Sequence, residues 1–186
     1  MYLAMLGHAQ AIVNAQTSPI TLVSGGAAVA DHLAVLLYLN DPKLQLTLHL
    51  PAPFDLQKQQ FVETPGNMYA PGNIANYYHR KATKSCGVKS LEQIAQAINK
   101  GAKVIVTPGF KERNTKVAQE SDVLVAFTFG DGAVLKDGGT LDTTRKFLKA
   151  KAGAPSYHVD LFQMKVYSPA ITEPPVQKPN QGQLEI

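Results

Sequence analysis

The sequence predicts an α/β fold, a Rossmann-like doubly wound three-layer sandwich with a mainly parallel sheet. Short apolar and β-branched runs alternate with segments of helical periodicity along the 186-residue chain. Such alternation is typical of a parallel sheet with helices on both faces, because each crossover between parallel strands needs a connection of helix length. The most apolar run, residues 122–129, is expected to be a strand buried on both faces.

The first half of the chain follows this alternation. We expect a helix over residues 5–16, a strand over 20–24, a helix over 27–39 and a second strand over 44–50. In the second strand Leu alternates with Gln, Thr and His, which predicts one less buried face. Residues 51–72 are rich in Pro, Gln, Gly and Asn and predict a long loop or lid.

The second half continues the pattern. Residues 73–84 favour a short helix and residues 90–101 a clear one, in which Ser90 and Gln93 form a capping box and Gly101 is the stop signal. The remaining expected elements are a strand (102–108), a helical turn or two (111–121), a strand (122–129), a helix (140–153) and a last strand (155–161).

Length and composition indicate one domain. With 45% hydrophobic and 17% charged residues, 186 residues suffice for one good core and are few for two. We therefore assign residues 1–167 to a single domain. Residues 168–186 contain four prolines and predict an extended tail.

Charge and cysteine content limit the functional classes. The net charge of +4 comes from dispersed lysines and suits an anionic partner without identifying it. The single cysteine, Cys86, excludes an internal disulfide and fits a cytoplasmic protein. The apolar start lacks a basic beginning and is interrupted by His8 and Gln10, so we interpret it as an amphipathic helix and not a secretory signal. No apolar run is long enough to cross a membrane.

A glycine pair lies between the first expected strand and its helix. Gly25 and Gly26, which follow Ser24, lack the Cβ atoms that would block close approach, and backbone amides at a helix start attract negative charge. This loop is therefore expected to contact an anion, most simply a phosphate. Asp31, about one turn inside the expected helix, would hold a ribose hydroxyl, a base edge or a neighbouring loop amide.

A second glycine pair repeats this arrangement later in the chain. Gly138 and Gly139 precede Thr140, whose hydroxyl can cap the helix or bond a phosphate oxygen. Between the two glycine loops, Arg113 provides a planar fork suited to phosphate or carboxylate, and Asn114 can contact a base or brace the loop. Because ligands of parallel α/β sheets bind outside the carboxyl ends of the strands, we expect the three loops to converge.

These segments resemble the SLOG superfamily of Rossmann-like nucleotide-ligand proteins, and most of all its small DUF2493-type members. The resemblance rests on VSGGAAVAD (23–31), ERNTKVAQESDVLVAF (112–127) and DGGTLDTTRKF (137–147). The superfamily also contains the DNA-processing protein DprA and the LONELY GUY phosphoribohydrolases. The resemblance implies a nucleotide-ligand site at these loops and assembly into a homo-oligomer.

The sequence departs from the family pattern in three places. Val29 lies where the family usually has glycine, and Ala28 where it often has arginine. Family members usually begin with a strand ahead of the first helix, whereas this chain begins almost at that helix, so one wall of the expected pocket is missing or comes from another subunit. The glutamate of the phosphoribohydrolases falls on Thr143, and a threonine cannot act as an acid or base at neutral pH. Asp142, one residue earlier, would take its place only if the helix start is shifted.

We therefore expect a module or sensor that binds a nucleotide or a nucleotide-derived phosphate without a cofactor. The expected contacts are Ser24, Gly25, Gly26, Asp31, Arg113, Asn114, Gly138, Gly139, Thr140 and Thr143. One alternative is phosphoribohydrolase-like cleavage of the N-glycosidic bond of a nucleoside monophosphate.

The second alternative is DprA-like binding of single-stranded nucleic acid through the lysines, Tyr77, Tyr78 and His79, because aromatic and basic residues together can stack on and neutralise nucleotides. A surface helix with a tyrosine packed inward is the ordinary interpretation of that motif. The five histidines are dispersed, so no metal site is expected.

Overall fold

The structure is a computed structural model that describes residues 1–17, 19–63, 66, 68–129, 133–135 and 138–168. The predicted tail falls outside the described residues, except for Ser168. The architecture is mixed α/β, as the alternating pattern predicts. Its first sheet contains β1 (Thr21–Ser24), β2 (Gln45–Leu50) and β5 (Lys103–Val106), all parallel, in the order β1-β2-β5.

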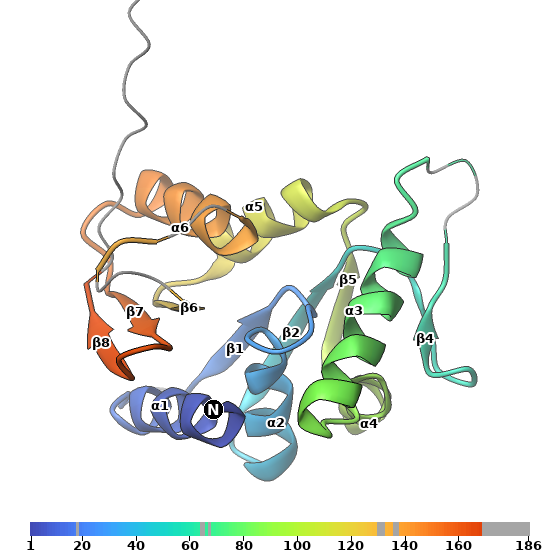
Figure 1. Cartoon of the computed structure of the whole chain (residues 1–186), viewed down its shortest axis with the longest axis horizontal. Coiled ribbons are helices and arrows are strands. Elements are labelled where there is room, and N and C mark those ends of the chain that lie inside the picture. The colour runs from blue at the N-terminus through green and yellow to red at the C-terminus, as the bar shows by residue number, and fades with distance from the viewer. Residues whose placement is uncertain (18, 64–65, 67, 130–132, 136–137, 169–186) are drawn as a thin grey trace, which may run out of the picture.

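A second sheet contains β6 (Leu124–Thr128), β7 (Ser156–Asp160) and β8 (Lys165–Tyr167). β6 and β7 are parallel, and β8, which was not predicted, is antiparallel to β7. Within the described part of the chain, no strand pairing joins β1 to β6. The two sheets are therefore separate, as Figure 1 shows.

Helices lie on both sides of the first sheet. α2 packs against α1 and α4, and α5 packs against α6. Figure 1 shows α5 and α6 on the opposite side of β1 and β2 from α1 and α2. The helices are α1 (Tyr2–Asn14), α2 (His32–Asn40), α3 (Pro71–Cys86), α4 (Ser90–Lys100), α5 (Phe110–Glu120) and α6 (Gly139–Ala150). No helix in the described residues has the length and apolar character that crossing a membrane requires.

Two helices differ clearly from their expected ranges. α2 begins at His32 and not at residue 27, because residues 27–31 form a loop that is braced by its own hydrogen bonds. α5 has 11 residues instead of a turn or two. Its polar composition weakens the sequence signal, but packing against α6 stabilises the helix.

The region predicted as a long loop contains a short hairpin. β3 (Phe54–Asp55) and β4 (Gln60–Phe61) pair antiparallel, so the expectation of an irregular segment over 51–72 is wrong in part. Asn76 of α3 fixes this hairpin, since its side chain accepts from the Phe61 N–H and donates to the Phe61 carbonyl, both at 2.9 Å. Strands of two residues are too short to show a period in the sequence.

β2 is buried on both faces, so the expectation of one less buried face is wrong. Five of its six residues are buried, including Thr47 and His49. β2 lies between β1 and β5, and both α2 and α5 contact it. His49 tolerates this position because its Nε2 lies 2.9 Å from Oε2 of Glu120.

The predicted capping box of α4 is also wrong. Lys89 is the N-cap, and the Ser90 hydroxyl lies 2.8 Å from Nδ1 of His79. Gln93 instead pairs with Nε2 of His32 at 2.7 Å. The predicted stop is confirmed, because Gly101 ends the helix in the left-handed region with φ +109°.

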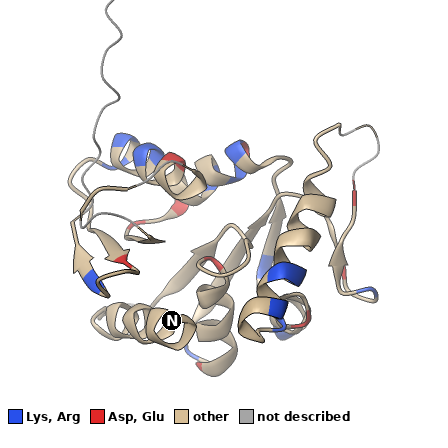
Figure 2. Ribbon diagram, in the orientation of Figure 1, with Lys and Arg blue, Asp and Glu red and all other residues tan. Residues whose placement is uncertain are grey.

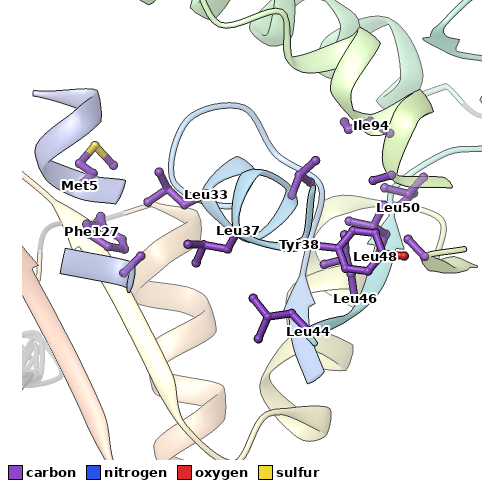
Figure 3. Packing of buried hydrophobic residues seen from close by; sticks show 14 of the residues in the cluster. Met5, Leu33, Leu37, Tyr38, Leu44, Leu46, Leu48, Leu50, Ile94 and Phe127 are labelled. Atoms are coloured by element: carbon purple, nitrogen blue, oxygen red, sulfur yellow. The ribbon is translucent and has the colours of Figure 1, made fainter. Parts of the chain in front are cut away.

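The main hydrophobic core joins the two sheets. Figure 3 shows Met5 of α1 and Leu33 of α2 close to Phe127 of β6, and Val159 of β7 belongs to the same cluster. Met5 is completely buried. Packing of α1 and α2 against β6 thus holds the second sheet in place where strand pairing does not.

Candidate functional site

A cleft of about 890 Å³ lies between β1 and β6. β1 contributes Leu22 and Val23 to its walls, and β6 contributes Val125 and Ala126. Helices α1, α2, α5 and α6, the loops on either side of β1, residues 121–123 ahead of β6 and Thr47 of β2 complete the lining. The volume falls within the range of small-molecule sites.

The three predicted loops open to this one cleft. Most of the predicted site residues line it, namely Gly25, Asp31, Arg113, Asn114, Gly139, Thr140 and Thr143. Ser24 is buried below the loop, where its hydroxyl donates to the Asp31 carbonyl (2.9 Å) and accepts from the Gly26 N–H (3.1 Å). Gly26 faces a second pocket, described below, and Gly138 is exposed at the start of α6.

Arg113, in the first turn of α5, connects two of these loops. Its guanidinium is buried, and Nη1 donates to the Gly25 carbonyl at 2.8 Å. Nε and Nη2 donate to Oδ1 of Asn114 at 3.2 and 2.8 Å. Oδ2 of Asp31 lies 4.0 Å from Nη1. The planar fork thus fixes the loop after β1 against α5.

Asn114 extends the connection to α6. Its Nδ2 donates to Oδ2 of Asp142 at 3.0 Å, and Nζ of Lys146 donates to the same oxygen at 2.8 Å. Burial raises the pKa of Asp142, but hydrogen bonds from Lys146 and Asn114 and the nearby lysine charges outweigh burial, so the net pKa is lowered. We call Arg113, Asn114, Asp142 and Lys146 the rim network.

Asp31 is the residue before α2 and not one turn inside it, which corrects the expected position. Its Oδ2 accepts from the Ala27 N–H at 3.3 Å, so the carboxylate braces the loop after β1. Val29 in this loop has φ +73°, a conformation that β-branched residues rarely adopt. The backbone at Val29 therefore has a conformation that glycine adopts without strain.

The start of α6 lies at the rim of the cleft. The helix begins at Gly139 with Gly138 as N-cap, so Thr140 lies inside the first turn and does not cap the helix as one interpretation expected. The Thr143 hydroxyl donates to the Gly139 carbonyl at 2.9 Å. Because Gly138 has no side chain, the first amides of α6 have no side-chain cap and remain suited to an anion.

His79 is a site residue whose role the sequence did not predict. It is completely buried, while Tyr77 and Tyr78 are exposed, so the expectation of an inward tyrosine is wrong. Its Nε2 lies 3.0 Å from the Gly26 carbonyl, which can only accept, so Nε2 carries the proton and Nδ1 accepts from Ser90. The helical spacing of His79 from Ala75 and Ala82 is the signal that places it on the apolar face.

His32 packs beside His79, with ring centroids 6.4 Å apart. It is buried, and its Nδ1 has no hydrogen-bond partner within the described part of the chain. Burial lowers the pKa of both rings, that of His32 to about 4. Both histidines are therefore neutral in the folded protein at neutral pH.

Basic side chains lie on α5 and α6, and one of them, Arg113, lines the cleft. Figure 2 shows Lys and Arg along both helices. Lys146 donates to the Lys111 carbonyl at 2.8 Å, which places two lysines next to the rim network. Among the described residues, no group of three or more His, Cys, Asp or Glu side chains is arranged to hold a metal ion.

Comparison with known proteins gives one informative match. The chain is 41% identical over 128 residues to an uncharacterized protein of Acanthamoeba polyphaga mimivirus. The aligned region covers 68% of this chain and 65% of the relative, which is less than two thirds of the relative's length. No family model and no solved structure matches the chain.

The packing at Gly25 gives a test of the loop geometry. A Cβ at Gly25 would lie 2.7 Å from Oδ2 of Asp31 and 2.9 Å from Nε of Arg113, so Gly25→Ala should lower the free energy of unfolding by about 1–3 kcal/mol. A Cβ at Gly139 would lie 3.8 Å from Nδ2 of Asn114, an ordinary contact distance, so Gly139→Ala should change the free energy of unfolding by less than about 0.5 kcal/mol. Urea unfolding measures both, and equal stability of the two variants would contradict the geometry.

The buried state of His32 predicts a pH dependence. A histidine that titrates near 6.5 when unfolded and near 4 when folded binds its proton preferentially in the unfolded chain between these values. Its contribution, roughly 3 kcal/mol, should therefore be present above pH 6.5 and be lost as the pH falls toward 4. Urea unfolding between pH 7 and 5 should show a shallower pH slope for His32→Gln than for the unsubstituted protein. An unchanged slope would show that His32 is not buried in its neutral form.

Proposed function

We propose that this protein is a SLOG-type module that binds a nucleotide or a nucleotide-derived phosphate in the cleft between β1 and β6. We further propose that its scaffold is a Rossmann-like three-layer sandwich. One observation carries the proposal: segments far apart in the sequence, namely the loop at Gly25, the first turn of α5 with Arg113 and the start of α6 at Gly139, line one cleft. The rim network connects these loops.

The phosphate is assigned to the start of α6. The amides of Gly139 and Thr140 lie at the positive end of a 12-residue helix, and both residues line the cleft. Thr140 adds a hydroxyl, and Arg113 has further N–H groups beyond its three hydrogen bonds. Lys146, on the same helix, is paired with Asp142 at 2.8 Å.

The organic part of the ligand is assigned to a second pocket of about 670 Å³ on the other side of the loop after β1. Its lining is mainly apolar and includes Val29, Tyr78 and Phe110. Arg113 lines both this pocket and the cleft. An anionic rim beside an apolar pocket suits a ligand with a phosphate and a ring, as in a nucleotide.

We assign binding and not cleavage to this site. The carboxylate of Asp142 already accepts hydrogen bonds from Asn114 and Lys146, and the Thr143 hydroxyl donates within its own helix. The rim therefore has no carboxylate at the position that the phosphoribohydrolases use. His79 is buried, so it is not available for stacking on a nucleic-acid base.

Calorimetric titration with AMP, GMP and inorganic phosphate tests the proposal. We expect the nucleotides to bind more tightly than phosphate alone, because only they fill both pockets. Thr140→Val and Arg113→Lys should each weaken binding about tenfold, the usual effect of losing a hydrogen bond to a charged group. Arg145→Gln, on the exposed part of α6, is the matched control and should bind like the unsubstituted protein.

Absence of binding at millimolar nucleotide would overturn the proposal. An equal loss of nucleotide affinity in Arg145→Gln and Thr140→Val would overturn it too. Release of free base from AMP or GMP over hours would identify the phosphoribohydrolase alternative instead. Thermal unfolding of each variant separates loss of binding from loss of folding.

A further inference from the structure

The solvent-exposed side of α3 carries aromatic and basic side chains together. The opposite side of the helix, with Ala75, Asn76, His79 and Ala82, is buried against the rest of the protein and fixes the orientation of α3. The aromatic and basic residues of the exposed side are Tyr77, Tyr78, Arg80, Lys81 and Lys84. We call these five residues the α3 surface.

The α3 surface forms a continuous stripe along about two turns of the helix. Tyr77, Lys81 and Lys84 follow one another at positions i, i+4 and i+7, and Arg80 is three residues after Tyr77. Residues at these spacings are neighbours on a helix, with Cβ atoms about 5–6 Å apart. A ligand that lies along α3 therefore contacts aromatic and basic groups in succession.

The two tyrosines leave a large aromatic area in solvent. Tyr77 is 60% exposed and Tyr78 is 56% exposed, and their rings contact each other edge to face with centroids 5.3 Å apart. Proteins usually bury most of the area of aromatic side chains in cores or interfaces, so two neighbouring exposed rings indicate a surface that contacts a ligand. Rings that are more than half exposed keep area on which a planar group can stack.

The charge of the α3 surface is entirely positive. α3 contains no aspartate and no glutamate. Figure 2 shows its basic residues in blue. Within the described part of the chain, no ion pair involves Arg80, Lys81 or Lys84, and Glu92 of the neighbouring helix α4 is paired with Lys89. Three cations without an acidic partner in these residues attract a polyanion.

The other basic helices lack this combination. α5 and α6 also carry lysines and arginines, but the acidic residues Glu112, Glu120 and Asp142 lie among them. Their aromatic residues, Phe110 and Phe147, are not exposed. The α3 surface thus differs from α5 and α6 both in its charge and in its exposed rings.

We propose that the α3 surface binds single-stranded nucleic acid. Arg80, Lys81 and Lys84 contact successive phosphates, and unpaired bases stack on Tyr77 and Tyr78. Aromatic stacking combined with phosphate contacts is the usual way in which proteins hold single strands without reading their sequence. A duplex keeps its bases paired inside, and an anionic lipid surface has no ring to stack, so only a single strand uses both parts of the surface.

This inference does not rest on the proposed nucleotide site. Tyr78 and Lys81 also line the second pocket, whereas Tyr77, Arg80 and Lys84 line neither that pocket nor the cleft. Substitutions of Tyr77 and Lys84 therefore change the α3 surface and leave the residues of the proposed nucleotide site in place.

Fluorescence anisotropy with a labelled oligothymidylate of about eight nucleotides tests the inference. Three phosphate contacts predict a slope of about −2 for log K against log salt concentration, so affinity should fall roughly 20-fold between about 50 and 200 mM salt. Tyr77→Ala should weaken binding about tenfold, and Tyr77→Phe, which keeps the ring, should bind like the unsubstituted protein. Lys84→Gln should make the slope shallower by about 0.7.

The matched control is Lys149→Gln, at an exposed position of α6, which should change neither affinity nor slope. The inference is overturned if the single strand does not bind at low salt, if Tyr77→Ala binds it unchanged, or if the two lysine variants change the slope equally. Equal affinity for a duplex of the same length would overturn it as well. Binding to phosphatidylserine vesicles but not to the oligothymidylate would overturn it in favour of a lipid surface.

AMP calorimetry of the same proteins reports on the proposed function separately. Weakened oligothymidylate binding by Tyr77→Ala with unchanged AMP binding supports the α3 surface as a distinct site. If the unsubstituted protein binds the oligothymidylate but not AMP, the proposed nucleotide site fails and the α3 surface stands. Thermal unfolding of each variant shows whether it is folded.

Discussion

The structure depends most on the buried guanidinium of Arg113. A buried charge is costly unless hydrogen bonds satisfy it, and the partners of Arg113 are the Gly25 carbonyl and the Asn114 side chain. Because Asn114 also donates to Asp142, one chain of hydrogen bonds joins the loop after β1 to the start of α5 and to α6. The two sheets share no strand pairing among the described residues, so side chains hold these loops together where backbone pairing does not.

The loop after β1 is held from both sides. Arg113 donates to the carbonyl of Gly25, and the neutral ring of His79 donates to the carbonyl of Gly26. This fixed loop separates the cleft from the second, apolar pocket. Its rigidity explains how Val29 can be kept in a left-handed conformation, since surrounding contacts must offset that strain. A preformed loop with a polar rim on one side and an apolar pocket on the other is what the proposed ligand requires.

Much of the fold could be predicted from local patterns, and the elements that could not be predicted have physical reasons. Alternating apolar runs predicted β1, β2, β5, β6 and β7, and glycine pairs with Arg113 predicted which loops face the cleft. The β3–β4 hairpin and β8 are too short to show a period. The hydroxyl of Ser90 was expected to cap a helix but is used by His79, a partner 11 residues away. The separation of β1 from β6 could not be predicted from the sequence either, because strand order depends on tertiary packing and not on any local segment.

A double-mutant cycle on Asn114 and Asp142 tests the central claim most directly, because their side chains form the link between α5 and α6. Urea unfolding of Asn114→Ala, Asp142→Ala and the double variant gives the coupling free energy. If the rim network holds the loops together, the coupling should be between about 0.5 and 3 kcal/mol. Strictly additive effects would contradict the account, because they would mean that the two residues stabilise the protein independently.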